Sequence, residues 1–323
     1  MTYTNFPNGV TSFGVPMVGG VGGLPLTGTW RFVNYAAGSD GNEGTADSPL
    51  QTLSRAYSLC TAGANDVVVI MGDGSTTATQ RLTSSLDWAK NATHLIGMTA
   101  PTMISQRARI STLTTATTNI NPLMTVSASG CIFANFSMFQ GVGQSATDEK
   151  LIDVTGDRNY FANVHFGGMG HATGAGRAGS YVMYLNDGDE NTFDGCTFGL
   201  DTVARTAANA SVKFGGQSQR NVFNNCLFPL YATAATPLVI DANSVGSIDR
   251  FQLFKNCSII NSGTSSLAAV VGFNASQGGV IFMDNCSALG ATDWTASDTA
   301  TVKITGPVPN GDTSGMAVSA DAT

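Results

Sequence analysis

Short runs of alternating apolar and polar residues recur along the middle of the chain at an almost constant interval. Six hexapeptides align with one another, and five of the six carry Asn at the third position. Their first residues lie 28 to 32 positions apart: Phe133, Phe161, Phe193, Phe223, Phe254 and Met283. A second set of strand-like runs accompanies them, at 123–126, 151–154, 181–185, 211–214, 237–240, 269–271 and 301–304. Each repeat of about 30 residues therefore contains at least two short strands.

This period excludes several repeat architectures. No segment of 120–305 has the length and spacing of a helix, which excludes leucine-rich, ankyrin and tetratricopeptide solenoids. A propeller blade of four strands needs a longer period. The remaining arrangement is a parallel β-solenoid, in which each coil stacks one strand spacing, about 4.8 Å, above the last. We therefore predict an all-β fold, a parallel β-helix of about 30 residues per coil, over residues 30–304.

Stacked coils bring equivalent positions into ladders. The third position predicts an amide ladder at a bend, because Asn tolerates left-handed backbone; its members are Asn135, Asn163, Asn225, Asn256 and Asn285. The fourth position predicts an inward stack, formed by Phe136, Val164, Cys196, Cys226, Cys257 and Cys286. A buried cysteine packs as a small hydrophobe, and neighbours about 4.8 Å apart do not match disulfide geometry. We expect free thiols that fill the core.

The chain on either side of the repeats has a different character. Ser48–Pro49, followed by apolar residues at helical spacing, predicts a capping helix at about 49–60. Residues 305–323 are small and polar and predict a loose tail. Residues 1–29 predict an extended attachment arm, with apolar side chains set among glycines and prolines: Phe6, Val10, Phe13, Val15, Met17, Val21, Leu24 and Leu26. The alternative is that this arm folds back and caps its own solenoid.

Composition narrows the classes of function. Charged residues make up 11% of the chain, against roughly 25% in an average soluble domain, and the net charge is −7. Without clustered Lys and Arg, nucleic acid is excluded as a partner. No apolar stretch is long enough to span a membrane, and the first twenty residues lack a secretory pattern. We expect synthesis in a cytoplasm, where cysteines stay reduced.

The strongest candidate for chemistry is the acidic turn of Asp187, Asp189 and Glu190. With Asp157 and Asp194 nearby, it could supply the two carboxylates of a glycosidase or oxygen ligands for Ca²⁺. The simpler reading is a solvated turn, since Asp, Gly and Asn are common turn residues. We adopt that reading and predict no catalytic residues, no metal and no cofactor.

The three histidines, His94, His165 and His171, are too scattered to form a catalytic triad. His165 occupies an outward position in its strand and is predicted at the surface. His171 lies in a glycine-rich loop at 167–179 that lacks the strand–loop–helix context of a phosphate cradle.

Two stretches resemble known families. Tyr3–Pro16 resembles the N-terminal arm of virion proteins from tailed bacteriophages. Gly38–Leu53 resembles the opening of right-handed parallel β-helix domains of the pectate-lyase-like class. The second resemblance implies a fold but no particular activity. The first implies a homotrimer mounted on a capsid or a tail, and it carries no catalytic residues.

Three functions remain open. The first is a non-enzymatic structural virion protein, a capsid decoration, cement or head-fibre component that contacts the major capsid protein. The second is a short tailspike enzyme that cleaves host polysaccharide, and the third is a tail fibre that binds a host surface glycan without cleaving it. Low charge and the missing acid pair favour the first, so we expect a homotrimer located in the virion.

Overall fold

The computed structural model describes residues 11–12, 15–16, 28–295 and 302–305. Strand β1 (Thr11–Ser12) pairs antiparallel with β2 (Val15–Pro16). The other predicted arm residues lie outside the described part: Phe6, Val10, Phe13, Met17, Val21, Leu24 and Leu26. Residues 306–323 of the predicted tail also lie outside it.

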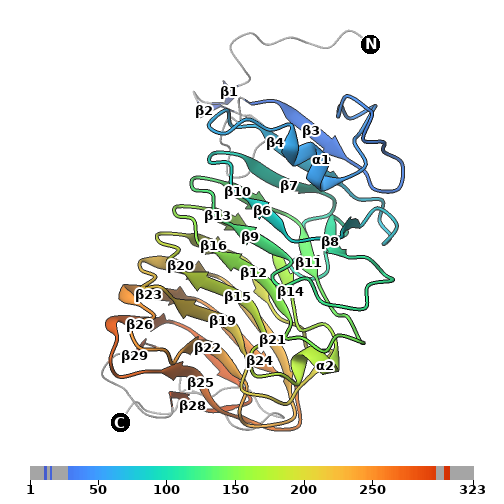
Figure 1. Ribbon diagram of the computed structural model, residues 1–323. Coiled ribbons are helices and arrows are strands. Elements are labelled where there is room, and N and C mark those ends of the chain that lie inside the picture. The colour runs from blue at the N-terminus through green and yellow to red at the C-terminus, as the bar shows by residue number, and fades with distance from the viewer. Residues whose placement is uncertain (1–10, 13–14, 17–27, 296–301, 306–323) are drawn as a thin grey trace.

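From Trp30 onward the chain winds through three sheets in turn, and Figure 1 shows the coils stacked from the N-terminal to the C-terminal end. Sheet I contains β3 (Trp30–Val33), β4 (Val67–Met71), β7 (His94–Met98), β10 (Ile132–Ala134), β13 (Tyr160–Ala162), β16 (Thr192–Asp194), β20 (Asn221–Asn224), β23 (Asp249–Lys255), β26 (Gly278–Asp284) and β29 (Val302–Thr305). Sheet II contains β5 (Gln80–Leu82), β8 (Arg109–Thr112), β11 (Ser137–Phe139), β14 (His165–Gly167), β17 (Thr197–Phe198), β21 (Leu227–Ala232), β24 (Ser258–Asn261) and β27 (Ser287–Leu289), with β18 (Ala204–Arg205) beside β21. Sheet III contains β6 (Leu86–Trp88), β9 (Met124–Val126), β12 (Lys150–Val154), β15 (Tyr181–Asn186), β19 (Ala210–Gly215), β22 (Leu238–Ala242), β25 (Leu267–Phe273) and β28 (Ala291–Thr295).

Neighbouring strands within these three sheets are parallel, and each belongs to the next coil. The predicted all-β parallel β-helix is confirmed. Its register follows the repeat, because Phe161 lies opposite Phe133 on one side and Phe193 on the other. The same row continues through Phe223 and Phe254.

These phenylalanines form the centre of the core. The rings of Phe133, Phe161, Phe193, Phe223 and Phe254 stack with centroids 4.3 to 4.7 Å apart. All are fully buried. Offset stacking of this kind adds to the apolar burial that stabilises each coil. A second stack, of Phe166, Phe198 and Phe228, lies on the sheet II side, with centroids 5.1 Å apart.

The predicted inward cysteine stack makes contacts that the repeat alone does not reveal. Cys196, Cys226, Cys257 and Cys286 are buried free thiols. Each sulfur lies 3.3 to 3.4 Å from the carbonyl oxygen of the phenylalanine one coil earlier, and can donate its S–H to it. Burial raises the pKa of the Cys196 thiol to about 12. The thiols therefore join successive coils while remaining protonated.

The capping helix is shorter than predicted. Helix α1 spans Leu53–Ser58, with Thr52 at its N-cap, whereas Leu50 forms a bridge with Val33 of sheet I. The Asp40 carboxylate explains the later start. It accepts hydrogen bonds from the backbone N–H groups of Gln51 and Thr52 and from the Thr52 hydroxyl, and so holds this segment extended. Figure 1 places α1 beside β3 and β4 at the N-terminal end.

The repeats contain one short helix that the sequence pattern does not predict. Helix α2 spans Ala172–Ala175, and its N-cap is His171, whose ring nitrogen accepts from the Thr173 N–H. A single turn is too short to leave a periodic pattern in the sequence. Neither helix of the described chain is long and apolar enough to cross a membrane.

Candidate functional site

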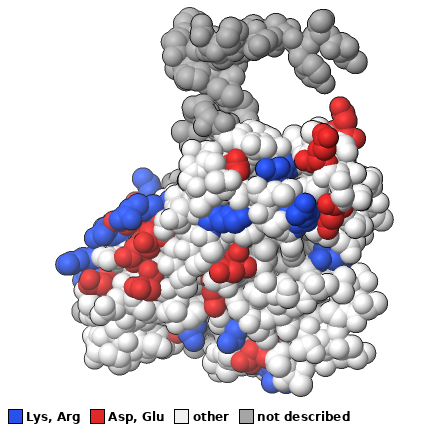
Figure 2. Space-filling view, turned by 45° about the horizontal axis from the view of Figure 1, so that its top comes forward, with Lys and Arg blue, Asp and Glu red and all other residues white. Residues whose placement is uncertain are grey.

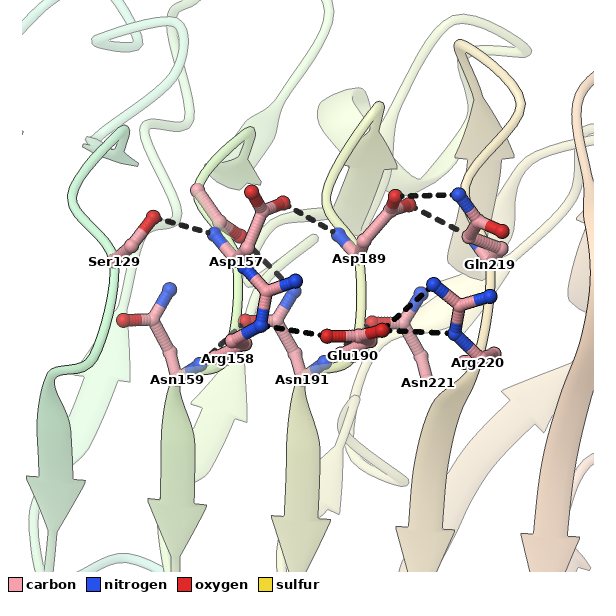
Figure 3. A network of polar contacts seen from close by, with 11 residues as sticks. Ser129, Asp157, Arg158, Asn159, Asp189, Glu190, Asn191, Gln219, Arg220 and Asn221 are labelled. Carbon is pink, nitrogen blue, oxygen red and sulfur yellow. Dashed lines mark hydrogen bonds and ion pairs between the residues drawn. The ribbon is translucent and has the colours of Figure 1, made fainter.

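The acidic turn lies at the corner where the chain passes from sheet III to sheet I, between β15 and β16. Figure 3 shows it in line with the equivalent turns of the adjacent coils. The backbone N–H of Asp189 donates to Asp157 Oδ1 at 2.9 Å. The two oxygens of Asp189 accept from the backbone N–H and the side-chain amide of Gln219, at 3.0 and 2.8 Å. These carboxylates therefore join one coil to the next.

Glu190 also joins adjacent coils, through ion pairs. Its carboxylate lies 2.7 Å from Arg158 Nε and 2.6 Å from Arg220 Nη2, in the preceding and following coils. The hydrogen bond from Arg220 and the two positive charges lower the pKa of Glu190. Asp187 adopts a left-handed φ of 65°, and its N–H donates to the Gly215 carbonyl. In the described chain no group of three or more His, Cys, Asp or Glu could hold a metal ion.

A second asparagine ladder, which the sequence analysis missed, lies just inside this corner. Asn159, Asn191 and Asn221 are almost fully buried. The N–H of Asn159 donates to Asn191 Oδ1, and the N–H of Asn191 donates to Asn221 Oδ1, both at 2.9 Å. The Asn191 side-chain amide donates back to the Gly156 carbonyl at 3.0 Å. The signal was present, because each of these asparagines precedes a core phenylalanine by two residues.

The predicted ladder lies at the opposite corner, between sheets I and II. Its five members all have φ between 50° and 59°. Side-chain amides bond along it from Asn163 to Asn135 and from Asn285 to Asn256, at 3.1 and 2.8 Å. Gly195 takes this position in the one coil without Asn, also at positive φ. This ladder fixes a tight bend, and nothing in its contacts indicates catalysis.

The predicted surface position of His165 is wrong. Its side chain faces outward from β14, yet it is only 3% exposed. His165 Nδ1 accepts from the Ser105 N–H, and Nε2 lies 3.0 Å from the Gly199 carbonyl. The segment that precedes β8 covers the His165 ring. The same segment also contacts Thr197, whose hydroxyl donates to the Met103 carbonyl. Burial lowers the pKa of His165.

A buried carboxyl that the sequence did not single out lies beneath the glycine-rich loop. Glu149 is fully buried, and its Oε1 accepts from the Gly170 N–H at 2.9 Å. A Cβ on Gly174 would lie 2.5 Å from Glu149 Oε2, so the glycine lets α2 pack directly against the carboxyl. The loop at 167–179 thus covers Glu149. Burial raises the pKa of Glu149 to about 8.

Hollows lie on the outer faces of sheets II and III. Two adjoin on the outer face of sheet II, with volumes of about 280 and 350 Å³. A third, of about 300 Å³, lies among alanines and apolar residues on the outer face of sheet III near β22 and β25. None of the described residues that line these three hollows is Asp or Glu. Glycoside cleavage by the usual pair of carboxylates therefore has no acid positioned there.

The fold of this protein is similar to that of several proteins of known structure. A pectin methylesterase from Aspergillus niger superposes with a TM-score of 0.52 and 16% identity, covering 92% of this chain and 93% of that one. The pectate lyase Pel9A superposes with a TM-score of 0.51 and 13% identity, covering 82% and 65%. A Geobacillus virus E2 protein, ORF18, matches with a TM-score of 0.37 and 12% identity, covering 85% and 59%, too weakly for an argument. No family model and no curated protein matches the sequence.

At these identities the likeness extends to architecture and not to activity. The protein has the pectate-lyase-like parallel β-helix fold.

The inner asparagine ladder makes a direct prediction. Replacing Asn191 with Ala leaves the Asn159 N–H and the Gly156 carbonyl without these partners in a buried corner. We expect Asn191→Ala to lower the free energy of unfolding by about 1–3 kcal/mol. The control is Asn224→Ala, which removes one half-exposed contact to Asp194. Denaturant titration measures both, and an equal effect would contradict a special role for the ladder.

Glu149 predicts an unusual pH dependence. Its pKa is higher in the folded state than in the unfolded state, so its contribution to stability is complete below pH 4.5 and is lost as pH rises towards about 8. Glu149→Gln removes this titration. As pH rises from 5 to 8, the melting temperature of the variant should therefore increase by a few degrees relative to that of the wild type. The exposed Glu43→Gln is the matched control, and parallel curves for Glu149→Gln and the wild type would refute the assignment.

Proposed function

We propose that the protein is a non-enzymatic structural component of a tailed-phage particle, a decoration, cement or head-fibre protein that binds the major capsid protein as a homotrimer. The observation that carries this proposal is the use of the acidic turn. Asp157, Asp189 and Glu190 are engaged with neighbouring coils. The resemblance of Tyr3–Pro16 to virion proteins supports the proposed location on a particle.

A structural role fits the way these contacts are distributed. The arginines favour the ionised form of Glu190 and keep its pKa low, which makes it a poor general acid near neutral pH. The contacts of the acidic turn also resist the separation of one coil from the next. A solenoid whose coils are joined by such contacts suits a structural protein.

An apolar patch supports the homotrimer. On the outer face of the last coils of sheet I, Phe251 lies opposite Val280 and Leu253 opposite Phe282. Phe251 and Phe282 are 40% and 36% exposed. Most of the surface in Figure 2 is uncharged, and part of its charge gathers along one edge. Large exposed aromatic side chains commonly mark contacts between proteins, and closed symmetry is the usual outcome for identical copies.

A second candidate is a tail protein that binds or cleaves host polysaccharide. The hollows on sheet II favour binding, because they offer a polar groove on the surface. Incubating the purified protein with host capsule or lipopolysaccharide separates the two candidates. We expect no shortening of the polysaccharide, and depolymerisation would overturn the non-enzymatic proposal.

Deletion of residues 2–28 tests attachment. The proposal assigns particle binding to the arm, so the truncated protein should keep its melting temperature and its trimeric sedimentation but fail to join particles. Full-length protein added to the same particles is the control. Normal decoration by the truncated protein would contradict the proposal, and unfolding of the truncated protein would favour an arm that caps its own solenoid.

A further inference from the structure

The strap, residues 99–108 between β7 and β8, crosses the outer face of sheet II. Its two ends are joined by a hydrogen bond from the Ala108 N–H to Thr99 Oγ1 at 3.1 Å. Its middle reaches β17, three strands beyond β8, because the Thr197 hydroxyl donates to the Met103 carbonyl at 2.9 Å. Three strand spacings correspond to about 14 Å. The strap therefore lies over later coils before the chain returns to β8.

Two further hydrogen bonds hold the strap to the coil of β14. The Ser105 N–H donates to His165 Nδ1 at 3.0 Å, and Gln106 Nε2 donates to the Asn163 carbonyl at 2.9 Å. The tip of the strap exposes two large apolar side chains, Met103 and Ile104. A segment with exposed side chains and few buried apolar contacts opens at a lower free-energy cost than the core. Whether the strap stays in place therefore depends on these polar contacts.

The contact between Ser105 and His165 depends on the protonation state of the imidazole ring. Nδ1 accepts a hydrogen bond, so it carries no proton, and Nε2 lies 3.0 Å from the Gly199 carbonyl, to which it donates. The ring that makes both contacts is therefore neutral. A second proton would bind to Nδ1 and face the Ser105 N–H, so two donors would oppose each other. The resulting positive charge would also be almost fully buried.

The surroundings of His165 favour the neutral ring. The residues opposite it on the two neighbouring strands are uncharged: Ser137 and Thr197. Charged groups come from the strap, from β8 and from the segment after β17: Arg107, Arg109 and Asp201. Burial lowers the pKa of His165 and Arg109 lowers it further, whereas the Gly199 carbonyl and Asp201 offset only part of the shift.

We propose that the strap is an acid-released cover of sheet II, which detaches when a proton on His165 Nδ1 displaces the Ser105 N–H. Above the ordinary pKa of histidine, about 6.5, the ring is neutral and the strap is held. As pH falls through the lower pKa of the folded protein, the ring takes up a proton and the contact is lost. Ser105 and His165 both line the hollow of about 280 Å³ on sheet II, so release of the strap removes part of its wall. This inference goes beyond the proposed structural function and does not depend on it.

NMR and hydrogen exchange of the full-length protein between pH 7.5 and pH 4.5 test the strap. The side-chain signals of the three histidines report their protonation, and the protection factor of each backbone amide reports local opening. We expect the protection of the Ser105 amide to fall at least tenfold as His165 takes up its proton, while the Met183 amide in β15 keeps its protection.

Three results would overturn the proposal. The first is a Ser105 amide that stays protected after His165 is protonated. The second is a His165 ring that stays neutral down to pH 4.5. The third is loss of protection at Met183 over the same pH range, because the whole solenoid would then be unfolding.

Variants assign the effect to one ring. His165→Asn offers an amide oxygen in place of Nδ1 and does not titrate, so its strap should stay protected down to pH 4.5. His171→Asn is the matched control, because it removes an exposed histidine and leaves a good N-cap for α2; its strap should be released as in the wild type. The buried His94 accepts from the Ile132 N–H of β10, so its titration should alter Ile132 and not the strap.

Equal acid release in His165→Asn and the wild type would contradict the proposal. If the strap of His165→Asn is unprotected already at pH 7.5, the wild-type titration decides, because the proposal requires His165 protonation and Ser105 exchange to share one midpoint.

Discussion

The stacking of one coil upon the next at a single strand spacing is the constraint on which the structure depends. Parallel strands place every residue above its equivalent, so a side chain that satisfies one coil must also fit the coil above. Apolar residues meet this condition by stacking, as Phe193 does between Phe161 and Phe223. Polar residues meet it by bonding to the neighbouring coil, as Asn191 does with Asn159 and Asn221.

The same constraint explains why the acidic turn is not a free site. A row of like charges spaced by one coil would be repulsive, and Arg158, Glu190 and Arg220 avoid this by alternating in sign. Where the outer face is not used in this way, it can serve other purposes. Two such places are the arginines of sheet II, Arg81 and Arg109, which belong to no ion pair in the described part of the chain, and the exposed aromatic residues of sheet I, Phe251 and Phe282.

Much of this architecture can be predicted from the sequence, because residues at equivalent positions of the repeat stack on one another in the structure. The aligned Phe, Asn and Cys positions correspond to real rows in the structure. What the repeat does not reveal depends on contacts between its units and irregular segments. His165 is buried by a loop from an earlier coil, α1 begins late because Asp40 holds the residues before it, and Glu149 is covered by a loop with no periodic pattern. The groove on sheet II was missed because Arg81 and Arg109 are 28 residues apart, and only the register of β5 and β8 makes them neighbours.

The location of the protein on an intact particle tests the structural account most directly. Electron microscopy of purified phage, combined with quantitative mass spectrometry, measures both position and copy number. The account predicts threefold clusters on the capsid surface, in a constant ratio to the major capsid protein. Absence from purified particles, or confinement to the tip of the tail, would contradict it.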